Sequence, residues 1–164
     1  MELKEAIENR RSVRRYRDTP IKDEKIRRII EAGLWAPCAN ERWRFAVVRN
    51  EVTKRAISSQ RHVLQAPVSI VVFVDLRGAD KQDAELYAIQ ETAAAIQNML
   101  LAAHEEGLST CWNGSFNDRA ICEILKAPEG WRPVAVVSVG YPAEKPDPPE
   151  RRPFDQVVYF ETIK

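Results

Sequence analysis

Arginine is concentrated near the start of this chain, in the stretch NRRSVRRYRD at residues 9–18. Five of the eight residues from Arg10 to Arg17 are arginine, although the whole chain of 164 residues has a formal net charge of only +1. In an extended segment alternate side chains share a face, so Arg10, Ser12 and Arg14 would point the same way. Two guanidinium groups and a hydroxyl on one face offer several donors to one anion, and the planar guanidinium matches phosphate oxygens.

The spacing alone leaves three interpretations open: a solvated arm whose arginines pair with nearby acids, a contact to nucleic acid, or a small-anion site. The 25 basic and 24 acidic residues argue against nucleic acid, because binding a polyanion usually needs a broad basic surface. The sequence has no Walker motif and no GxGxxG, and it contains only six glycines. A phosphate-bearing ligand would therefore be held by side chains rather than by a glycine-rich loop.

Composition places the chain among globular proteins. With 45% hydrophobic and 30% charged residues, we expect residues 1–164 to form one soluble domain. No apolar run reaches the roughly 18 to 20 residues that a membrane span needs, and the acidic start MELKEAIENRR does not resemble a secretory signal. Three cysteines at wide spacing, without a CxxC pair, indicate a reducing compartment. We therefore expect a cytoplasmic protein that contacts no membrane and no nucleic acid and has no metal site.

Hydrophobic periodicity predicts the elements that must position the arginines. Asp23 and Asn117 are candidate N-caps, and Gly107 is a candidate residue just after a helix. The expected order is a short helix ending near Arg10, a helix from Asp23 to before Pro37, a strand at 43–49, a helix at 51–60, a strand at 66–75, a helix at 84–106, a short strand at 108–112, a helix after Asn117 and a strand at 133–141. Strands that alternate with helices in this way indicate an α/β or α+β domain.

Two segments carry more apolar surface than one domain covers easily. Residues 92–103, TAAAIQNMLLAA, are apolar nearly all the way round a helix, which is typical of a central helix or of an interface. The proline-rich stretch at 142–153 cannot form a helix or a central strand, and it leads into the strand-like QVVYF at 156–160. This tail, residues 142–164, must lie on its own domain or on a partner subunit.

Seven blocks of the sequence occur in an order typical of one protein family. They are RRSVRRYRDTPI (10–21), IIEAGLWAP (29–37), WRFAVV (43–48), APVSIVVFVD (66–75), QETAAAIQNMLLAAHEEGLSTCWNGSF (90–116), VSVGYP (137–142) and RRPFDQVV (151–158). Together they resemble the FMN-dependent nitroreductase family over essentially the whole chain. The resemblance implies an α+β fold, a nitroreductase-like three-layer sandwich with a central, mostly antiparallel sheet flanked by helices. It further implies an intertwined homodimer with FMN at the subunit interface and the C-terminal tail packed on the partner.

The reaction that the resemblance implies is hydride transfer from NADH or NADPH to FMN, followed by reduction of a nitroaromatic, a quinone or a similar small acceptor. The flavin supplies this chemistry and the protein positions it, so we nominate no catalytic side chain. Two alternatives remain: an FMN-binding protein with little turnover, and another flavin reaction on the same scaffold, such as flavin fragmentation or reductive dehalogenation. The chain is short for the family and contains no obvious extra segment for a substrate lid.

The cofactor-binding positions of the family map onto three parts of this chain. The phosphate-binding pattern falls on Arg10, Arg11, Ser12 and Arg14, and the basic residues near the C-terminus fall on Arg151 and Arg152. The loop that reaches the flavin of the other subunit falls on Pro37, Cys38, Ala39 and Asn40; it is shorter than usual, and Cys38 stands where serine is common. The glycine whose backbone N–H faces the flavin N5 falls on Gly114, preceded by Asn113, and the absence of a side chain lets the ring approach closely.

Overall fold

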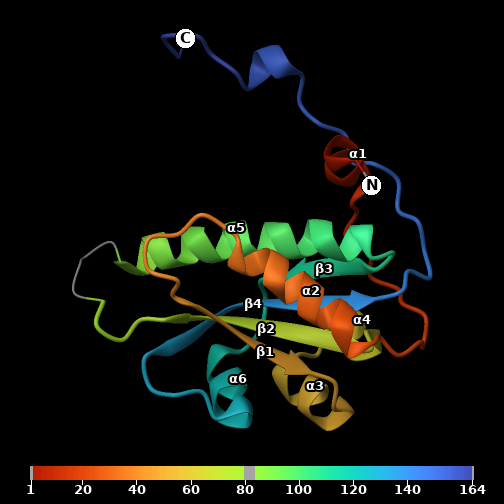
Figure 1. Ribbon diagram of the computed structural model, residues 1–164, viewed down its shortest axis with the longest axis vertical. Helices are drawn as coiled ribbons and strands as arrows, with labels where there is room; N and C mark the ends of the chain where they lie inside the picture. Colours follow the sequence, from red (N-terminus) through yellow and green to blue (C-terminus); the bar gives the residue numbers. More distant parts are fainter. Residues whose placement is uncertain (1, 80–83, 164) are drawn as a thin grey trace.

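The computed structural model describes residues 2–79 and 84–163, which form a four-stranded sheet with helices on both faces (Figure 1). The strands run in the order β1-β2-β4-β3, and every neighbouring pair is antiparallel. Along the chain the elements are α1 (Leu3–Asn9), α2 (Asp23–Leu34), β1 (Trp43–Val48), α3 (Glu51–Ile57), α4 (Arg61–Gln65), β2 (Val68–Asp75), α5 (Ala84–Glu105), β3 (Ser109–Asn113), α6 (Asp118–Leu125), β4 (Trp131–Gly140) and the short 3-10 helix η1 (Phe154–Gln156). The expected α+β sandwich is confirmed for the single chain, while the dimer stays a prediction.

The two central strands, β2 and β4, are rich in valine and isoleucine, which make up five of the eight residues of β2 and four of the ten of β4. Such residues fit a pleated surface covered on both sides. Every residue of β2 is buried. Its partner β4 contains Pro133, which has no N–H for the ladder, and the register shifts where Val72 and Phe73 face this part of β4. The irregularity lets a proline lie in a central strand without ending the sheet.

Helices α2 and α5 cover one face of the sheet, and α3, α4 and α6 cover the other (Figure 1). The first face buries Ile26, Ile29, Ile96 and Met99 against Ile70 and Val72, and the second buries Ile57, Val63 and Ile121 against Val71 and Val136. Helices α2 and α5 approach closely at Gly33, where an added Cβ would lie 2.9 Å from the Met99 Cγ. The core therefore consists of two apolar layers, one on each face of the sheet.

Helix α5 is central, as its composition predicts, and it also leaves apolar surface uncovered. Its inner face is buried from Ala88 to Ala103. On its outer side, Leu101 and the Leu3 side chain of α1 line an apolar hollow of about 450 Å³. The hollow also includes Trp35, which is 88% exposed. A large aromatic residue this exposed beside an apolar hollow marks a surface suited to a partner.

One of the two expected helix caps is confirmed and the other is wrong. The Asn117 side chain accepts a hydrogen bond from the Ala120 N–H at 3.0 Å and caps α6. Asp23 is the first residue of α2 rather than its cap, since Lys22 holds the N-cap position. The Asp23 carboxylate instead accepts a hydrogen bond from Arg49 Nη2 at 2.6 Å, so a long-range ion pair takes the place of the local cap.

Two further expectations are wrong. The helix expected at 51–60 ends at Ile57 because Ser58 adopts an extended backbone, and a second helix, α4, follows it. The strand-like stretch at 156–160 forms no strand, since η1 occupies its start and the rest is irregular. The tail leaves the sheet after β4, passes α1 and stands away from the body of the chain (Figure 1). There Phe154 and Phe160 are 68% and 79% exposed.

The arginine-rich segment is hydrogen-bonded both to β3 and to the chain that follows β4. On one side the Val13 N–H donates to the carbonyl of Thr110 in β3 at 3.0 Å. On the other side the Arg17 N–H donates to the Tyr141 carbonyl at 2.9 Å, just after β4. Tyr16 is buried between them, and its hydroxyl donates to the Val13 carbonyl at 2.6 Å. Backbone hydrogen bonds therefore fix this charged surface segment at two places on the sheet and its continuation.

We expect any side chain at Gly140, the last residue of β4, to overlap its neighbours and destabilise the fold. A Cβ there would lie 2.6 Å from Tyr16 Cδ1 and 2.9 Å from Pro67 Cδ. We expect Gly140→Ala to lower the free energy of unfolding by about 1–3 kcal/mol, the usual cost of overpacking, as measured by urea denaturation of the apoprotein. Gly114→Ala is the matched control, because a Cβ there meets no described atom within 4 Å. Equal losses in the two variants would contradict the packing explanation.

Candidate functional site

Four arginines and a serine converge on one cavity of about 640 Å³ beside α1, which we call the arginine cavity. They are Arg10, Arg11, Ser12, Arg14 and Arg151. The facing wall belongs to the tail and consists of Pro146, Asp147, Pro148 and Pro149. The N-terminal segment and the tail, which lie at opposite ends of the sequence, therefore build this cavity together.

Alternation along the extended segment separates the arginines, as their spacing predicts. Arg14 lines the arginine cavity, whereas Arg15 lines a different one. Arg17 also turns away, and its Nε donates to a backbone carbonyl just after β4 at 3.0 Å. Arg11 is an exception to the alternation, because it also lines the arginine cavity, and its Nη1 donates to the Glu8 carbonyl at 2.6 Å.

The arginine cavity is positively charged. Its lining carries four guanidinium groups against the carboxylates of Glu8 and Asp147. Burial lowers the pKa of Arg10, and the neighbouring charges of Arg11 and Arg151 lower it further. Guanidinium groups gathered in this way repel one another and are stabilised by an anion with several oxygen acceptors. The cavity therefore suits a phosphate group.

The two basic residues expected from the tail differ in position. Arg151 lines the arginine cavity, whereas Arg152 is exposed and is not among the lining residues. Figure 1 shows the tail passing beside α1 before it leaves the body of the chain. Within one chain, Arg151 is the member of this pair that borders the cavity.

The turn after β3 places Asn113 and Gly114 at the edge of the sheet. The Asn113 Oδ1 accepts a hydrogen bond from the Ser115 N–H at 3.1 Å, and its Nδ2 is buried without a partner in the described part of the chain. Gly114 is exposed, with open space where a Cβ would stand. Gln60 joins this turn because its Nε2 donates to the Ser115 carbonyl at 3.4 Å. The turn therefore presents an unpaired donor and an unobstructed stretch of backbone.

The predicted flavin loop lies at the other end of α5 and is exposed at Pro37, Cys38, Ala39 and Asn40. The Ala39 N–H donates to Glu91 Oε1 at 2.7 Å, which ties the loop to α5. Ala39 and Asn40 line a cavity of about 560 Å³ over the first turns of this helix. The Cys38 thiol is free and exposed.

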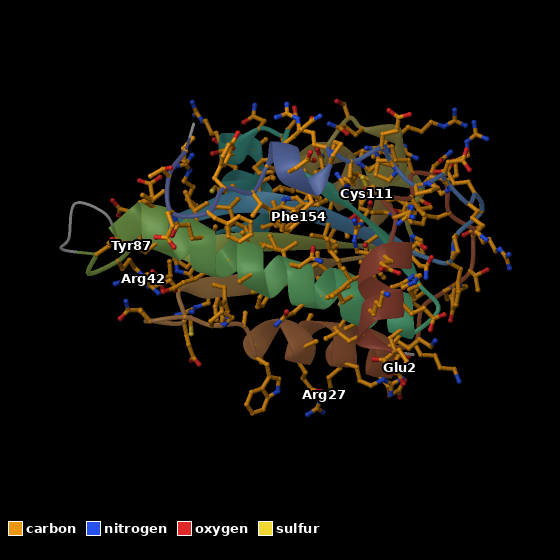
Figure 2. All side chains as sticks on the ribbon, turned by 90° about the horizontal axis from the view of Figure 1, so that it is seen from above. Glu2, Arg27, Arg42, Tyr87, Cys111 and Phe154 are labelled. Atoms are coloured by element: carbon orange, nitrogen blue, oxygen red, sulfur yellow. The ribbon has the colours of Figure 1, made fainter. Side chains whose placement is uncertain are left out.

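One chain does not bring the loop and the arginine cavity together. Glu91, which holds the loop, and His104, whose pKa is lowered by burial and by the charge of Arg10, lie on the same helix. A helix rises about 1.5 Å per residue, so about 20 Å of α5 separates them. Figure 2 shows Arg42 beside one end of α5 and Glu2 beside the other. The predicted flavin loop and the predicted phosphate-binding arginines therefore lie far apart within one chain.

Two acidic residues of the site carry no signal in the sequence. Glu91 is 52 residues from Ala39, whose N–H it accepts. Glu144 accepts the N–H of Arg14 at 2.7 Å across 130 residues of chain. Glutamate is a common surface residue, and no spacing pattern marks either position for a backbone contact. Only the fold brings each carboxylate to its partner.

No group of three or more His, Cys, Asp or Glu side chains within residues 2–79 and 84–163 is arranged to hold a metal ion. Across the same two ranges, no helix combines the length and the apolar character that crossing a membrane requires.

Comparison with solved structures defines the class of fold. The crystal structure of a nitroreductase family protein from Clostridium novyi NT gives a TM-score of 0.81 at 30% identity, over 90% of this chain and 89% of that one. The NADPH:FMN oxidoreductase of Vibrio harveyi, solved in complex with NAD+, gives a TM-score of 0.89 at 25% identity, over 98% of this chain and 77% of that one. The chain thus has the fold of the nitroreductases.

Sequence comparison then identifies the family. The family model described as the nitroreductase family matches residues 7–60 and 55–141. A relative from Thermus thermophilus, named NADH dehydrogenase, is 32% identical and aligns with 98% of this chain and 96% of its own length. The chain belongs to the nitroreductase family. This confirms the resemblance carried by the seven sequence blocks and the expectation of an oxidoreductase.

Proposed function

We propose that this protein passes hydride equivalents from NADH or NADPH through bound FMN to a small acceptor such as a nitroaromatic compound or a quinone. The observation that carries the proposal is the convergence of four arginines and Ser12 on one cavity. FMN ends in a single phosphate, whose oxygens match a cluster of guanidinium groups and a hydroxyl. Family membership and the similarity to an NADPH:FMN oxidoreductase support the same cofactor and electron donor.

The residues along the edge of the sheet fit a flavin. When bound, FMN supplies the hydride chemistry, and the protein binds and orients it. The arginines hold the phosphate and do not move protons, because a guanidinium stays charged. At Gly114 the open space leaves room for a ring that a side chain would obstruct, and the buried Asn113 Nδ2 is an unused donor in the same turn. No side chain is assigned as an acid, a base or a nucleophile.

We infer further that the FMN site is shared between the two chains of a homodimer. The loop of each chain lies at the far end of α5 from its own arginine cavity, so we place the loop of a partner beside the flavin. The apolar hollow around Trp35 and the exposed Phe154 and Phe160 of the tail need a partner to cover them. We place the tail, residues 142–164, on that partner. An obligate interface of this kind buries on the order of 2,000 Å² or more.

The purified protein is expected to be yellow and to release FMN, not FAD, on denaturation. It should also oxidise NADH or NADPH under anaerobic conditions when a nitroaromatic compound or a quinone is present. Absorbance, chromatography of the released flavin and an acceptor panel measure these properties. A colourless protein that does not respond to added FMN would refute the cofactor. Bound FMN without oxidation of either nicotinamide would favour the alternative of an FMN-binding protein with little turnover.

Arg14 and Arg17 form a matched pair for testing the phosphate contact. A charge-assisted hydrogen bond to phosphate contributes about 1.5–3 kcal/mol, so we expect Arg14→Ala to weaken FMN binding roughly tenfold to a hundredfold. Arg17 points away from the arginine cavity, so Arg17→Ala should change the Kd by less than about twofold. Fluorescence titration of the apoprotein measures both values. Equal losses would indicate a diffuse positive field and not a shaped site.

Mixed dimers test whether each flavin site uses two chains. One chain carries Arg14→Ala in the arginine cavity, and the other carries Ala39→Arg in the loop. If the loop belongs to the partner's site, a mixed dimer has one site with both defects and one intact site. We therefore expect two homodimers that bind FMN poorly and a mixed dimer that holds one FMN, measured after purification on two different tags. A mixed dimer without bound flavin would show that the cavity and the loop of one chain serve the same site.

A further inference from the structure

Glu144 connects the tail to the arginine-rich segment. Its Oε1 accepts hydrogen bonds from two successive backbone N–H groups, those of Arg14 at 2.7 Å and Arg15 at 3.1 Å. Its Oε2 lies 3.6 Å from the Arg15 Nε. The Glu144 side chain is 29% exposed, so these contacts are partly shielded from water. A carboxylate that accepts two neighbouring N–H groups restrains the backbone that carries them.

These contacts fall where the arginine-rich segment changes its neighbour. Before Arg14, the Val13 N–H donates to a carbonyl of β3 at 3.0 Å. After Arg14, the Arg15 carbonyl accepts the Ala143 N–H at 2.9 Å, on the side of β4. Arg14 lies between these two hydrogen bonds, and Glu144 supplies the acceptor for its N–H. The carboxylate therefore holds the backbone at the point where its hydrogen-bonding partner changes from β3 to the chain after β4.

The same point in the backbone determines where two adjacent guanidinium groups go. Arg14 lines the arginine cavity, and Arg15 lines a separate cavity of about 850 Å³. Side chains alternate along extended backbone, so a local rotation at this point would turn Arg14 away from the arginine cavity and Arg15 toward it. Restraint of the backbone at these two residues therefore also restrains the direction of the Arg14 side chain.

The charge of Glu144 and its hydrogen bonds have different consequences for a bound phosphate. A negative charge near the arginine cavity repels phosphate, although it also offsets the mutual repulsion of the arginines before an anion binds. An amide oxygen would accept the same backbone N–H groups without that charge. The two contributions can therefore be separated by substitution.

We propose that Glu144 is the positioning residue of the phosphate site. It fixes the backbone of Arg14 and Arg15 so that Arg14 faces the phosphate and Arg15 does not. Glu144 acts through its two backbone hydrogen bonds and does not touch the cofactor. The inference rests on the proposed binding of FMN, whose phosphate is the group that Arg14 contacts.

Three variants test this role. Glu144→Ala removes the acceptor, and Glu144→Gln keeps an acceptor oxygen but removes the charge. The control is Glu129→Ala, which removes an exposed glutamate in the turn before β4. Each apoprotein is titrated with FMN and with riboflavin, which has the same ring but no phosphate. We expect Glu144→Ala to weaken FMN binding about tenfold and riboflavin binding less than about twofold. Glu144→Gln should stay within about threefold of the unmodified protein for both ligands, and Glu129→Ala should change neither.

A double variant tests whether the effect passes through Arg14. In a chain that already carries Arg14→Ala, the further change Glu144→Ala should cost no more FMN affinity, because residues that act through one contact are not additive. Additive losses would overturn the proposal, as would a Glu144→Ala variant that keeps the original ratio of riboflavin Kd to FMN Kd. A parallel loss of both ligands would show general unfolding at the site and would also overturn it.

Failure of the proposed function gives a different result. In that case the unmodified protein binds neither FMN nor riboflavin. Inorganic phosphate then serves as the probe, and its effect on the melting temperature replaces the flavin titration. The same order is expected, with stabilisation by phosphate reduced in Glu144→Ala and retained in Glu144→Gln and Glu129→Ala. Equal stabilisation in all three variants would overturn the positioning role.

Discussion

Hydrogen bonding of one short segment to an edge strand and to the chain after a central strand is the interaction on which the rest of the site depends. Residues 12–17 meet β3 on one side and the chain that follows β4 on the other. Without these bonds, so many neighbouring arginines would repel one another and stay solvated. Tyr16 adds an apolar anchor, because it packs with Val13 and Ala66 beneath the segment. Once the backbone is fixed, alternation directs Arg10, Ser12 and Arg14 to the arginine cavity and turns Arg15 to a different one.

The tail depends on the same arrangement. Tyr16 can pack against β4 only because Gly140 has no side chain, and the chain then leaves the sheet beside the arginines. The proline-rich stretch at 146–149 follows, and proline needs no ladder partner because it lacks an N–H. This stretch can therefore run over the surface as a wall of the cavity and bring Arg151 to it. The composition of the tail is explained by its course and not by disorder.

Apolar runs and hydrophobic periodicity in the sequence were sufficient to predict the main helices and strands. The apolar runs of β2 and β4 and the nearly uniform α5 leave few alternatives, and the alternation of Arg10, Ser12 and Arg14 predicted a shared direction. Local signals failed where a distant residue competed with them. The Asp23 carboxylate pairs with Arg49 instead of capping its helix.

The strand wrongly expected at 156–160 and the two glutamates that were not predicted share one physical cause, which is contact across the chain. The β-favouring residues at 156–160 form no strand, because β-propensity acts only where a sheet edge is available. Glu91 and Glu144 could not be singled out, since each acts on backbone N–H groups far away in the sequence. A single sequence contains no pattern for such contacts. The arginines of the site were therefore predictable, while the residues that position them were not.

Helix α5 works as a spacer of fixed length between two groups of residues. A helix advances about 1.5 Å and turns about 100° with each residue. One residue inserted or deleted between Glu91 and His104 would therefore rotate the flavin loop by about 100° relative to the arginine cavity of the same chain. The number of residues in this stretch is constrained more tightly than their identity, because many apolar side chains fill the same layer. Loops of this fold can accommodate changes in chain length, whereas α5 cannot, because its length sets the distance between the flavin loop and the arginine cavity.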